Sequence, residues 1–302
     1  MSNDAPELRP TRPLRRLILR LAAMAMLLYL GVCLLIYALQ TQLIFPGQDT
    51  QGTAFAQVRP GPDSELVRLS TANGVPVVGL FGPAKGAEGR VLDDASARPT
   101  MLYFYGNGMC LASSLDWFEE YRRIGLNVLI VDYVGYGLSG GSPSEANCYA
   151  TADAAWAHLQ SRPDIDPARI IVGGWSLGGA LAVDLAAREP VAGLVVLSSF
   201  SSMAEMAASI YPWLPVRLLL RHRFDSLSKM PQVTCPALIG HGEIDPMIPA
   251  EMSDRLAASA GGPVRQFVAI GAGHNDFYLI GRDLILEEVE RFVAGPVDSE
   301  AP

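Results

Sequence analysis

The sequence predicts an α/β fold in which a mainly parallel sheet is flanked by helices. Apolar runs of strand length alternate with helical stretches between about residues 101 and 294, and a G-x-S-x-G motif at 174–178 lies between a strand and the following helix. Upstream, residues 21–48 carry no charge. Continuous apolar strands are typical of a parallel sheet covered on both faces by helices. The uncharged run predicts a separate N-terminal transmembrane helix.

The N-terminal segment predicts a basic cytoplasmic tail at 1–16 and a transmembrane anchor at 17–40. Residues 21–39 are 19 positions without a charge, and at ~1.5 Å per residue such a helix nearly spans the ~30 Å hydrocarbon layer. A signal peptide is the alternative, but no small-x-small cleavage site follows the apolar run, which favours an uncleaved anchor. Five arginines in residues 1–20 place the N-terminus in the cytoplasm. The rest of the chain would then lie across a bacterial inner membrane, in the periplasm.

The folded domain is predicted over 41–295, with 296–302 as a C-terminal tail. It begins with a hairpin, because Asn73-Gly74 is a strong turn signal between the apolar runs 66–69 and 76–81. A surface loop over 82–99 follows. Residues 201–232 interrupt the later alternation and predict a minimal cap of one or two helices, whose apolar side chains either line a pocket or pack onto the sheet. Strands are expected at 101–105, 127–132, 169–174, 192–197, 236–240 and 264–270, and helices at about 112–124, 145–160, 177–188, 250–259 and 276–294.

The G-x-S-x-G motif predicts a nucleophile elbow around Ser176. Gly174 and Gly178 let the chain turn sharply while strand and helix come close together. The turn raises the serine hydroxyl above the sheet, and the first N–H groups of the new helix face any anion that develops there. The alternative is a tight turn around an ordinary serine, so the chemistry depends on a base and an acid elsewhere.

A serine becomes a strong nucleophile only beside a base that a third group orients. His274, in a glycine-rich loop after the apolar run 266–270, is the predicted base. Asp245, just past strand 236–240 and before a proline, is the predicted acid, with Glu243 as its competitor. Ser176, Asp245 and His274 each follow a predicted strand, and we predict that they form a catalytic triad. The other histidines are expected to be structural (His241) or at the surface (His158 and His222).

An acyl-transfer site also needs N–H donors for the oxyanion of its tetrahedral intermediate. The residue after the nucleophile supplies one donor, which here is Leu177. The second is expected from the loop after strand 101–105, where a Gly-Asn-Gly turn occupies residues 106–108. We predict an oxyanion hole formed by the backbone N–H groups of Asn107 and Leu177, with Gly108 as the near alternative to Asn107.

Several motifs occur together in this chain: the elbow, the turn at 106–108, Asp132-Tyr-Val-Gly-Tyr-Gly, His241-Gly-x-x-Asp and Gly273-His-Asn-Asp. With the N-terminal apolar segment and the order serine, aspartate, histidine, they resemble the α/β-hydrolase superfamily, and within it the BEM46-like group that includes ABHD13- and ABHD17-type proteins. The resemblance covers about residues 42 to 292. It departs at Tyr105, where a histidine is usual, and at Val134, where an arginine is common. It implies hydrolysis of acyl esters or thioesters.

Composition excludes some partners and cofactors. Residues 1–20 carry a net charge of +3, so within a total of −8 the remainder is −11, and such a domain lacks the basic face that nucleic-acid binding needs. No zinc-type cysteine spacing, P-loop or GxGxxG fingerprint occurs, so neither a metal nor a cofactor is expected. Cys110 and Cys148 are expected near neighbouring strands, and both a periplasmic disulfide and two buried thiols stay open.

These features predict a membrane-anchored serine hydrolase of the carboxylesterase or lipase type. His274 would deprotonate Ser176 while Asp245 orients the imidazole ring, and an acyl-enzyme would form. A thioesterase or peptidase would use the same residues and differ in the leaving group. A non-catalytic membrane scaffold is the alternative from another class. The predicted partners are a small-molecule or lipid acyl ester and the membrane.

Overall fold

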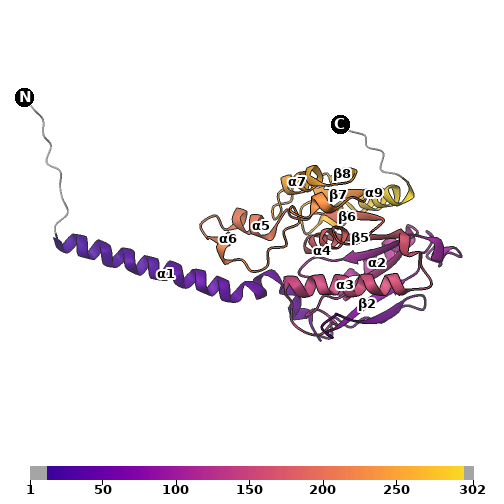
Figure 1. Cartoon of the computed structure of the whole chain (residues 1–302), viewed down its shortest axis with the longest axis horizontal. Helices are drawn as coiled ribbons and strands as arrows, with labels where there is room; N and C mark the ends of the chain where they lie inside the picture. Colours follow the sequence, from indigo (N-terminus) through magenta and orange to yellow (C-terminus); the bar gives the residue numbers. More distant parts are fainter. Residues whose placement is uncertain (1–11, 296–302) are drawn as a thin grey trace, which may run out of the picture.

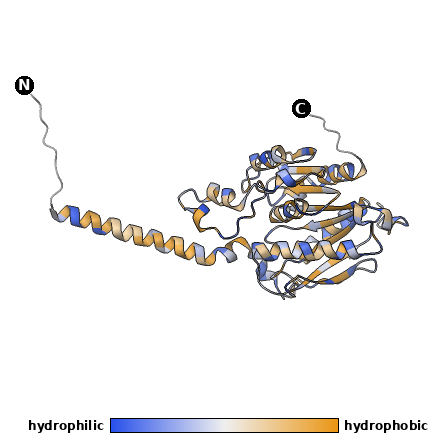
Figure 2. Cartoon of the chain, in the orientation of Figure 1, coloured by the Kyte–Doolittle hydropathy of each residue, from blue (hydrophilic) through white to orange (hydrophobic). Residues whose placement is uncertain are grey.

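The computed structural model of the chain describes residues 12–295. Residues 1–11 of the predicted tail, and the predicted C-terminal tail at 296–302, lie outside the described residues. A long helix, α1 (Arg12–Ile44), extends away from the α/β domain (Figure 1). In the described part of the chain it is the one helix long and apolar enough to cross a membrane. Figure 2 shows hydrophobic residues along most of its length.

Helix α1 is longer at both ends than the predicted anchor at 17–40. Pro13 is tolerated because the first turn of a helix has no N–H partner to lose, and the arginines that follow are good helix formers. The helix ends at Ile44 because Pro46 disfavours the helical conformation at Phe45. Residues 12–16, predicted as tail, therefore form the first turn of this helix.

The domain is built on an eight-stranded sheet in the order β1-β2-β4-β3-β5-β6-β7-β8. Strands β1 and β2 form the predicted antiparallel hairpin, with Gly74 at φ +76° in its turn. Strand β2 also pairs antiparallel with β4, and the other neighbouring pairs are parallel, which confirms the predicted fold class. The strands are β1 (Glu65–Ser70), β2 (Pro76–Gly82), β3 (Thr100–Phe104), β4 (Asn127–Val131), β5 (Ile170–Trp175), β6 (Gly193–Leu197), β7 (Ala237–Gly242) and β8 (Val264–Ala269).

Helices flank this sheet and follow the predicted alternation, with one difference. The helix expected over 276–294 is divided at Gly281, because glycine is a poor helix former. The α-helices of the domain outside the cap are α2 (Leu115–Arg123), α3 (Glu145–Ser161), α4 (Leu177–Ala186), α7 (Glu251–Ser259), α8 (Phe277–Ile280) and α9 (Arg282–Ala294). Short 3-10 helices are η1 (Pro46–Thr50), η2 (Ala95–Ala97), η3 (Leu111–Ser114), η4 (Pro167–Arg169) and η5 (Met230–Gln232).

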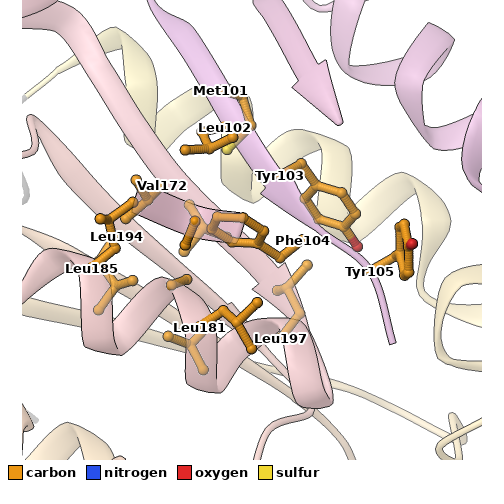
Figure 3. Packing of buried hydrophobic residues seen from close by; sticks show 14 of the residues in the cluster. Met101, Leu102, Tyr103, Phe104, Tyr105, Val172, Leu181, Leu185, Leu194 and Leu197 are labelled. Atoms are coloured by element: carbon orange, nitrogen blue, oxygen red, sulfur yellow. The ribbon is translucent and has the colours of Figure 1, made fainter. Parts of the chain in front are cut away.

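The core lies where the central strands meet α4. Leu102 and Phe104 of β3 are fully buried, and Leu181 and Leu185 of α4 pack in the same cluster (Figure 3). Every residue of α4 is buried, which explains why all of its residues except Asp184 are apolar. Each large apolar side chain contributes about 1.5–3 kcal/mol on burial. This packing fixes the segments that follow β3 and β5, where Asn107, Ser176 and Leu177 lie.

Residues 201–232 contain two short α-helices, α5 (Met203–Ile210) and α6 (Val216–Leu219), as expected of a minimal cap. Leu214 and Val216 are buried together with Cys33 of α1 in a small apolar cluster. The sequence left open whether the apolar side chains of the cap line a pocket or pack onto the sheet. Some of them instead pack against α1. Four large apolar side chains of the cap remain exposed: Ile210 (45%), Tyr211 (46%), Trp213 (56%) and Leu218 (86%).

Candidate active site

Ser176 lies on the sharp turn between β5 and α4. Its backbone has φ 55° and ψ −119°, a conformation that is costly for a residue with a Cβ and that clusters at functional sites. A Cβ at Gly174 would lie 2.2 Å from the carbonyl carbon of Gly178, and one at Gly178 would lie 2.0 Å from the carbonyl oxygen of Phe104. The serine hydroxyl of Ser199 donates to the carbonyl of Ser176 (2.8 Å). The turn is therefore fixed against the ends of β3 and β6.

The structure brings Ser176, His274 and Asp245 together. His274 Nε2 lies 3.0 Å from Ser176 Oγ, and His274 Nδ1 lies 2.7 Å from Asp245 Oδ2. Ser176 is 7% exposed and His274 is 4% exposed, while the Asp245 side chain is fully buried. The three residues follow β5, β7 and β8, whose carboxyl ends meet at one edge of the sheet. This alignment allows the serine proton to pass to Nε2 while Nδ1–H donates to the carboxylate.

The Asp245 carboxylate is held in the ionised form that this role requires. Its Oδ1 accepts hydrogen bonds from the backbone N–H groups of Met247 and Ile248, each 2.8 Å away. Burial raises the pKa of Asp245, but hydrogen bonds from His241, His274 and Ile248 outweigh it and hold that pKa well below its usual range. The competitor Glu243 is exposed and accepts instead from the N–H of Gly271 (2.9 Å).

His241 is a site residue whose contact with the acid was not predicted. Its Nε2 lies 2.9 Å from the carbonyl of Ile248, which can only accept, so Nε2 carries the proton. Nδ1 then accepts from the hydroxyl of Ser253 (2.6 Å). Nε2 is also 3.5 Å from Asp245 Oδ2. His241 thus fixes the loop that carries the acid, a structural role that its place at the end of a strand suggested.

The loop after β3 lies against the elbow, since Phe104 and Gly178 are in close contact. Leu177 is the first residue of α4, and the first N–H groups of a helix have no carbonyl partner in that helix. The backbone N–H of Asn107 makes no hydrogen bond with another described residue. The N–H groups of Leu177 and Asn107, which the sequence predicts for an oxyanion hole, therefore have no hydrogen-bond acceptor within the described residues.

A buried carboxylate anchors the loop that carries Asn107. Asp132, directly after β4, accepts from the Tyr105 hydroxyl (2.8 Å) and from the N–H groups of Leu111 and Leu138 (2.7 Å each). Burial raises the pKa of Asp132, although these three hydrogen bonds oppose the rise. Tyr105, where the resemblance leads one to expect histidine, therefore joins the loop after β3 to the loop after β4.

Tyr105→Phe is expected to lower the free energy of unfolding by about 1–3 kcal/mol, because the buried Asp132 carboxylate loses one of its three donors. Urea unfolding of the full-length protein measures this change. Tyr121→Phe is the matched control, since the Tyr121 hydroxyl is equally buried but has no hydrogen-bond partner among the described residues. Equal destabilisation by the two variants would contradict the role assigned to the Tyr105 hydroxyl.

The end of α1 contacts this same loop. The Asn107 side-chain amide donates to the carbonyl of Ile44 (3.1 Å), the last residue of α1. The N–H of Gly47 and the hydroxyl of Tyr136 both donate to the carbonyl of Asn107 (3.0 Å each). A Cβ at Gly47 would lie 2.0 Å from the Tyr136 ring, so only glycine allows this approach. Asn107 is therefore hydrogen-bonded to residues on both sides of the junction between α1 and the domain.

Trp175 is a further neighbour of the base that the sequence did not single out. Its ring stacks on that of His274, with centroids 5.1 Å apart and an angle of 26° between the planes. Trp175 occupies the first of the two variable positions of the G-x-S-x-G motif, and the motif specifies no side chain there. The stacking limits the directions in which the imidazole can turn.

Two predictions outside the triad are settled by burial. His222, predicted at the surface, is 8% exposed: its Nδ1 accepts from the N–H of Glu145 (3.3 Å) and its ring packs edge-on against Phe45. That prediction is wrong because the end of α1 covers this part of the cap. Within the described residues the four cysteines are free, and Cys110 and Cys148 are fully buried thiols rather than a disulfide.

The chain is similar in sequence to known proteins of the alpha/beta hydrolase fold. A family model described as the alpha/beta hydrolase fold matches residues 99–219. Over 277 residues the chain is 36% identical to an uncharacterised protein of Mycobacterium tuberculosis, a match that covers 91% of this chain and 94% of that protein. It is also 36% identical, over 200 residues, to alpha/beta hydrolase domain-containing protein 17B of Xenopus laevis, which covers 66% of this chain and 67% of the relative.

Solved structures with a similar fold include esterases. An esterase of Pyrococcus furiosus superposes with a TM-score of 0.64 at 17% identity, covering 78% of this chain and 92% of the esterase. An acetyl xylan esterase of Paenibacillus sp. R4 gives a TM-score of 0.58 at 18% identity, covering 76% and 86% respectively. At these identities the likeness is one of fold.

Proposed function

This chain belongs to the α/β-hydrolase superfamily, and we propose that it is a serine hydrolase that cleaves carboxylic esters through Ser176, His274 and Asp245. The observation that carries this proposal is the unbroken line of contacts from Asp245 through His274 to Ser176, at 2.7 Å and 3.0 Å. The fold and its esterase neighbours agree with a hydrolase. Ester cleavage and the roles of the three residues are the part that we propose.

In the proposed reaction Ser176 Oγ attacks the acyl carbonyl while His274 Nε2 takes its proton. Asp245 stabilises the imidazolium that forms, since its pKa is held low and it stays ionised. His274 then gives the proton to the leaving alcohol, and an acyl-enzyme remains on Ser176. Water, deprotonated by the same histidine, attacks the acyl-enzyme; the bond to Ser176 Oγ breaks, His274 returns the proton to Oγ, and the carboxylic acid is released.

The N–H groups of Leu177 and Asn107 are proposed to stabilise the oxyanion in both steps. They lie on the first residue of α4 and on the loop after β3, the two places that supply these donors in this type of site. Loss of one such donor typically costs about 2.7–4 kcal/mol of transition-state stabilisation. The contacts of Asn107 with Ile44 and Gly47 hold the second donor in position.

Full-length protein in detergent is expected to hydrolyse p-nitrophenyl esters, with kcat/KM higher for medium acyl chains than for acetyl. Each methylene that the site buries contributes about 0.8 kcal/mol. Steady-state rates for acetyl to octanoyl esters measure this preference. A kcat/KM that falls steadily with chain length would contradict it, and no hydrolysis of any ester would favour the non-catalytic scaffold.

We also propose that α1 is retained as a single-pass anchor with the domain in the periplasm. The Tyr29 hydroxyl donates to the carbonyl of Trp213 (2.9 Å), and the Gln40 amide donates to the carbonyl of Leu219 (3.3 Å). Cleavage of α1 as a signal peptide would leave these cap carbonyls without their donors. The arginines at the N-terminal end of α1 favour the cytoplasmic side. Alkaline phosphatase fused after residue 302 should be active, and an inactive fusion made at full length would overturn this orientation.

A further inference from the structure

One part of the cap lies along α1 over a long distance. We call residues 210–220, which include α6, the cap tip. Its contacts with α1 begin where Tyr29 donates to the carbonyl of Trp213 and end where Gln40 donates to the carbonyl of Leu219. Gln40 lies eleven positions after Tyr29, so the contact runs for about 16 Å along the helix at ~1.5 Å per residue. Figure 1 shows α5 and α6 beside the second half of α1.

The depth of these contacts follows from the charges on α1. Residues 21–44 are uncharged, and a ~30 Å hydrocarbon layer takes about 20 residues of helix. Arg20 and the arginines before it are costly inside that layer, so its boundary lies beyond them. Any span of about 20 residues within the uncharged range 21–44 contains Tyr29, Cys33 and Ile36. These three residues therefore lie inside the hydrocarbon layer. The side chains of the cap tip that pack with Cys33 must then lie there as well.

The backbone of the cap tip suits this environment. In a bilayer an unsatisfied N–H or carbonyl costs several kcal/mol, because no water is present to bind it. Two positions of the cap tip, Pro212 and Pro215, have no N–H at all. Most of the other N–H groups donate to backbone carbonyls within residues 207–216. The donors are the N–H groups of Tyr211, Leu214, Val216, Leu218, Leu219 and Leu220.

The side chains are distributed as at a membrane surface. Between residues 206 and 220 the chain carries a single charge, on Arg217, and the exposed Ile210, Trp213 and Leu218 point away from the protein core. Arg221 and Arg223 follow directly, and the Arg221 guanidinium lies 5.1 Å from the centre of the Tyr37 ring, nearer the domain. Long arginine side chains at such a position reach anionic headgroups.

We propose that the cap tip is embedded in the lipid bilayer alongside α1, with its exposed apolar side chains against acyl chains, and with Arg217 and the following Arg221 and Arg223 toward headgroup phosphates. Helix α5 leads from the cap tip back to residues 198–202, where Ser199 contacts the elbow. Resting on the proposed function, this assigns a substrate class: an ester whose acyl chain lies in the bilayer and reaches Ser176 along the cap.

Embedding of the cap tip is tested on the full chain in phosphatidylcholine vesicles. All variants carry Cys235→Ser, because Cys235 is the one free cysteine of the described residues that is not buried. An NBD fluorophore is placed on Leu218→Cys, and on Val91→Cys as control, since Val91 is an exposed apolar residue (40%) in the loop between β2 and β3. Lipids with a doxyl group on the acyl chain should quench position 218 and not position 91. The proposal is overturned by no quenching at position 218 or by equal quenching at both positions. Absence of quenching at 218 is also the result expected if a second copy of the chain covers the cap tip.

The substrate class is tested with Leu218→Asp and its control Val91→Asp. We expect the ratio of turnover of a long-chain ester in vesicles to turnover of soluble p-nitrophenyl butyrate to fall about tenfold or more in Leu218→Asp, because a charge opposes burial in lipid. Fluorophosphonate labelling of both variants shows that each is folded. An unchanged ratio in Leu218→Asp overturns the route along the cap. If the unaltered protein hydrolyses neither ester, the proposed function fails, and NBD quenching still decides the embedding separately.

Discussion

Ser176→Ala is expected to reduce ester turnover by about 10⁵-fold or more and to abolish labelling by a fluorophosphonate probe. The hydroxyl of Ser176 is the nucleophile of the proposed reaction, and loss of the nucleophile disables the base and acid that act through it. The substitution by alanine removes only the hydroxyl group, so the buried turn between β5 and α4 should be kept. Gel-based labelling with a fluorescent fluorophosphonate, together with initial rates on p-nitrophenyl butyrate, measures both effects.

The control for this variant is Ser161→Ala, a change of an exposed serine at the end of α3. It should label and turn over at the level of the unaltered protein. Substantial residual labelling in Ser176→Ala would show that another residue is the nucleophile, and the proposed triad would have to be abandoned.

Asp245→Asn is expected to lower kcat by about 10⁴-fold, because an amide cannot stabilise the imidazolium and favours the wrong tautomer of His274. His274→Ala should be impaired at least as strongly, since it removes the base itself. Glu243→Gln is the matched control in the same loop. Its side chain is exposed, and its one hydrogen bond within the described residues comes from the N–H of Gly271, so activity should stay within about twofold of the original.

Steady-state kinetics of the three variants on one soluble ester distinguish the two acids. A large loss in Glu243→Gln with little loss in Asp245→Asn would reverse the assignment. Comparable losses in both would point to a disturbed loop after β7 rather than to a catalytic carboxylate.

Much of the fold could be predicted because its information is local. The apolar runs of β3, β5 and β6 are continuous, as strands buried on both faces must be. The candidate triad could be proposed for a related reason: Ser176, Asp245 and His274 each follow such a strand, and parallel strands bring their carboxyl ends to one edge. The structure places these three side chains within hydrogen-bond distance of one another.

What the sequence could not provide are contacts between segments far apart along the chain. His222 looked exposed among arginines, yet 181 residues separate it from Thr41 on α1, which lies against its ring. The hydrogen bond between Tyr105 and Asp132 depends in the same way on how the loops after β3 and β4 meet above the sheet. Neither the hydrophobic periodicity nor the motifs of the sequence predict such long-range contacts.

The junction at Asn107 has a consequence for how this protein could be released from its anchor. Ile44 and Gly47 both hydrogen-bond to Asn107, so a protease that cut between them would sever the tether and loosen the loop proposed to stabilise the oxyanion. The shed domain would keep its nucleophile and base but lose part of the support for its transition state. Cleavage at this junction would therefore lower the catalytic rate without removing the nucleophile or the base.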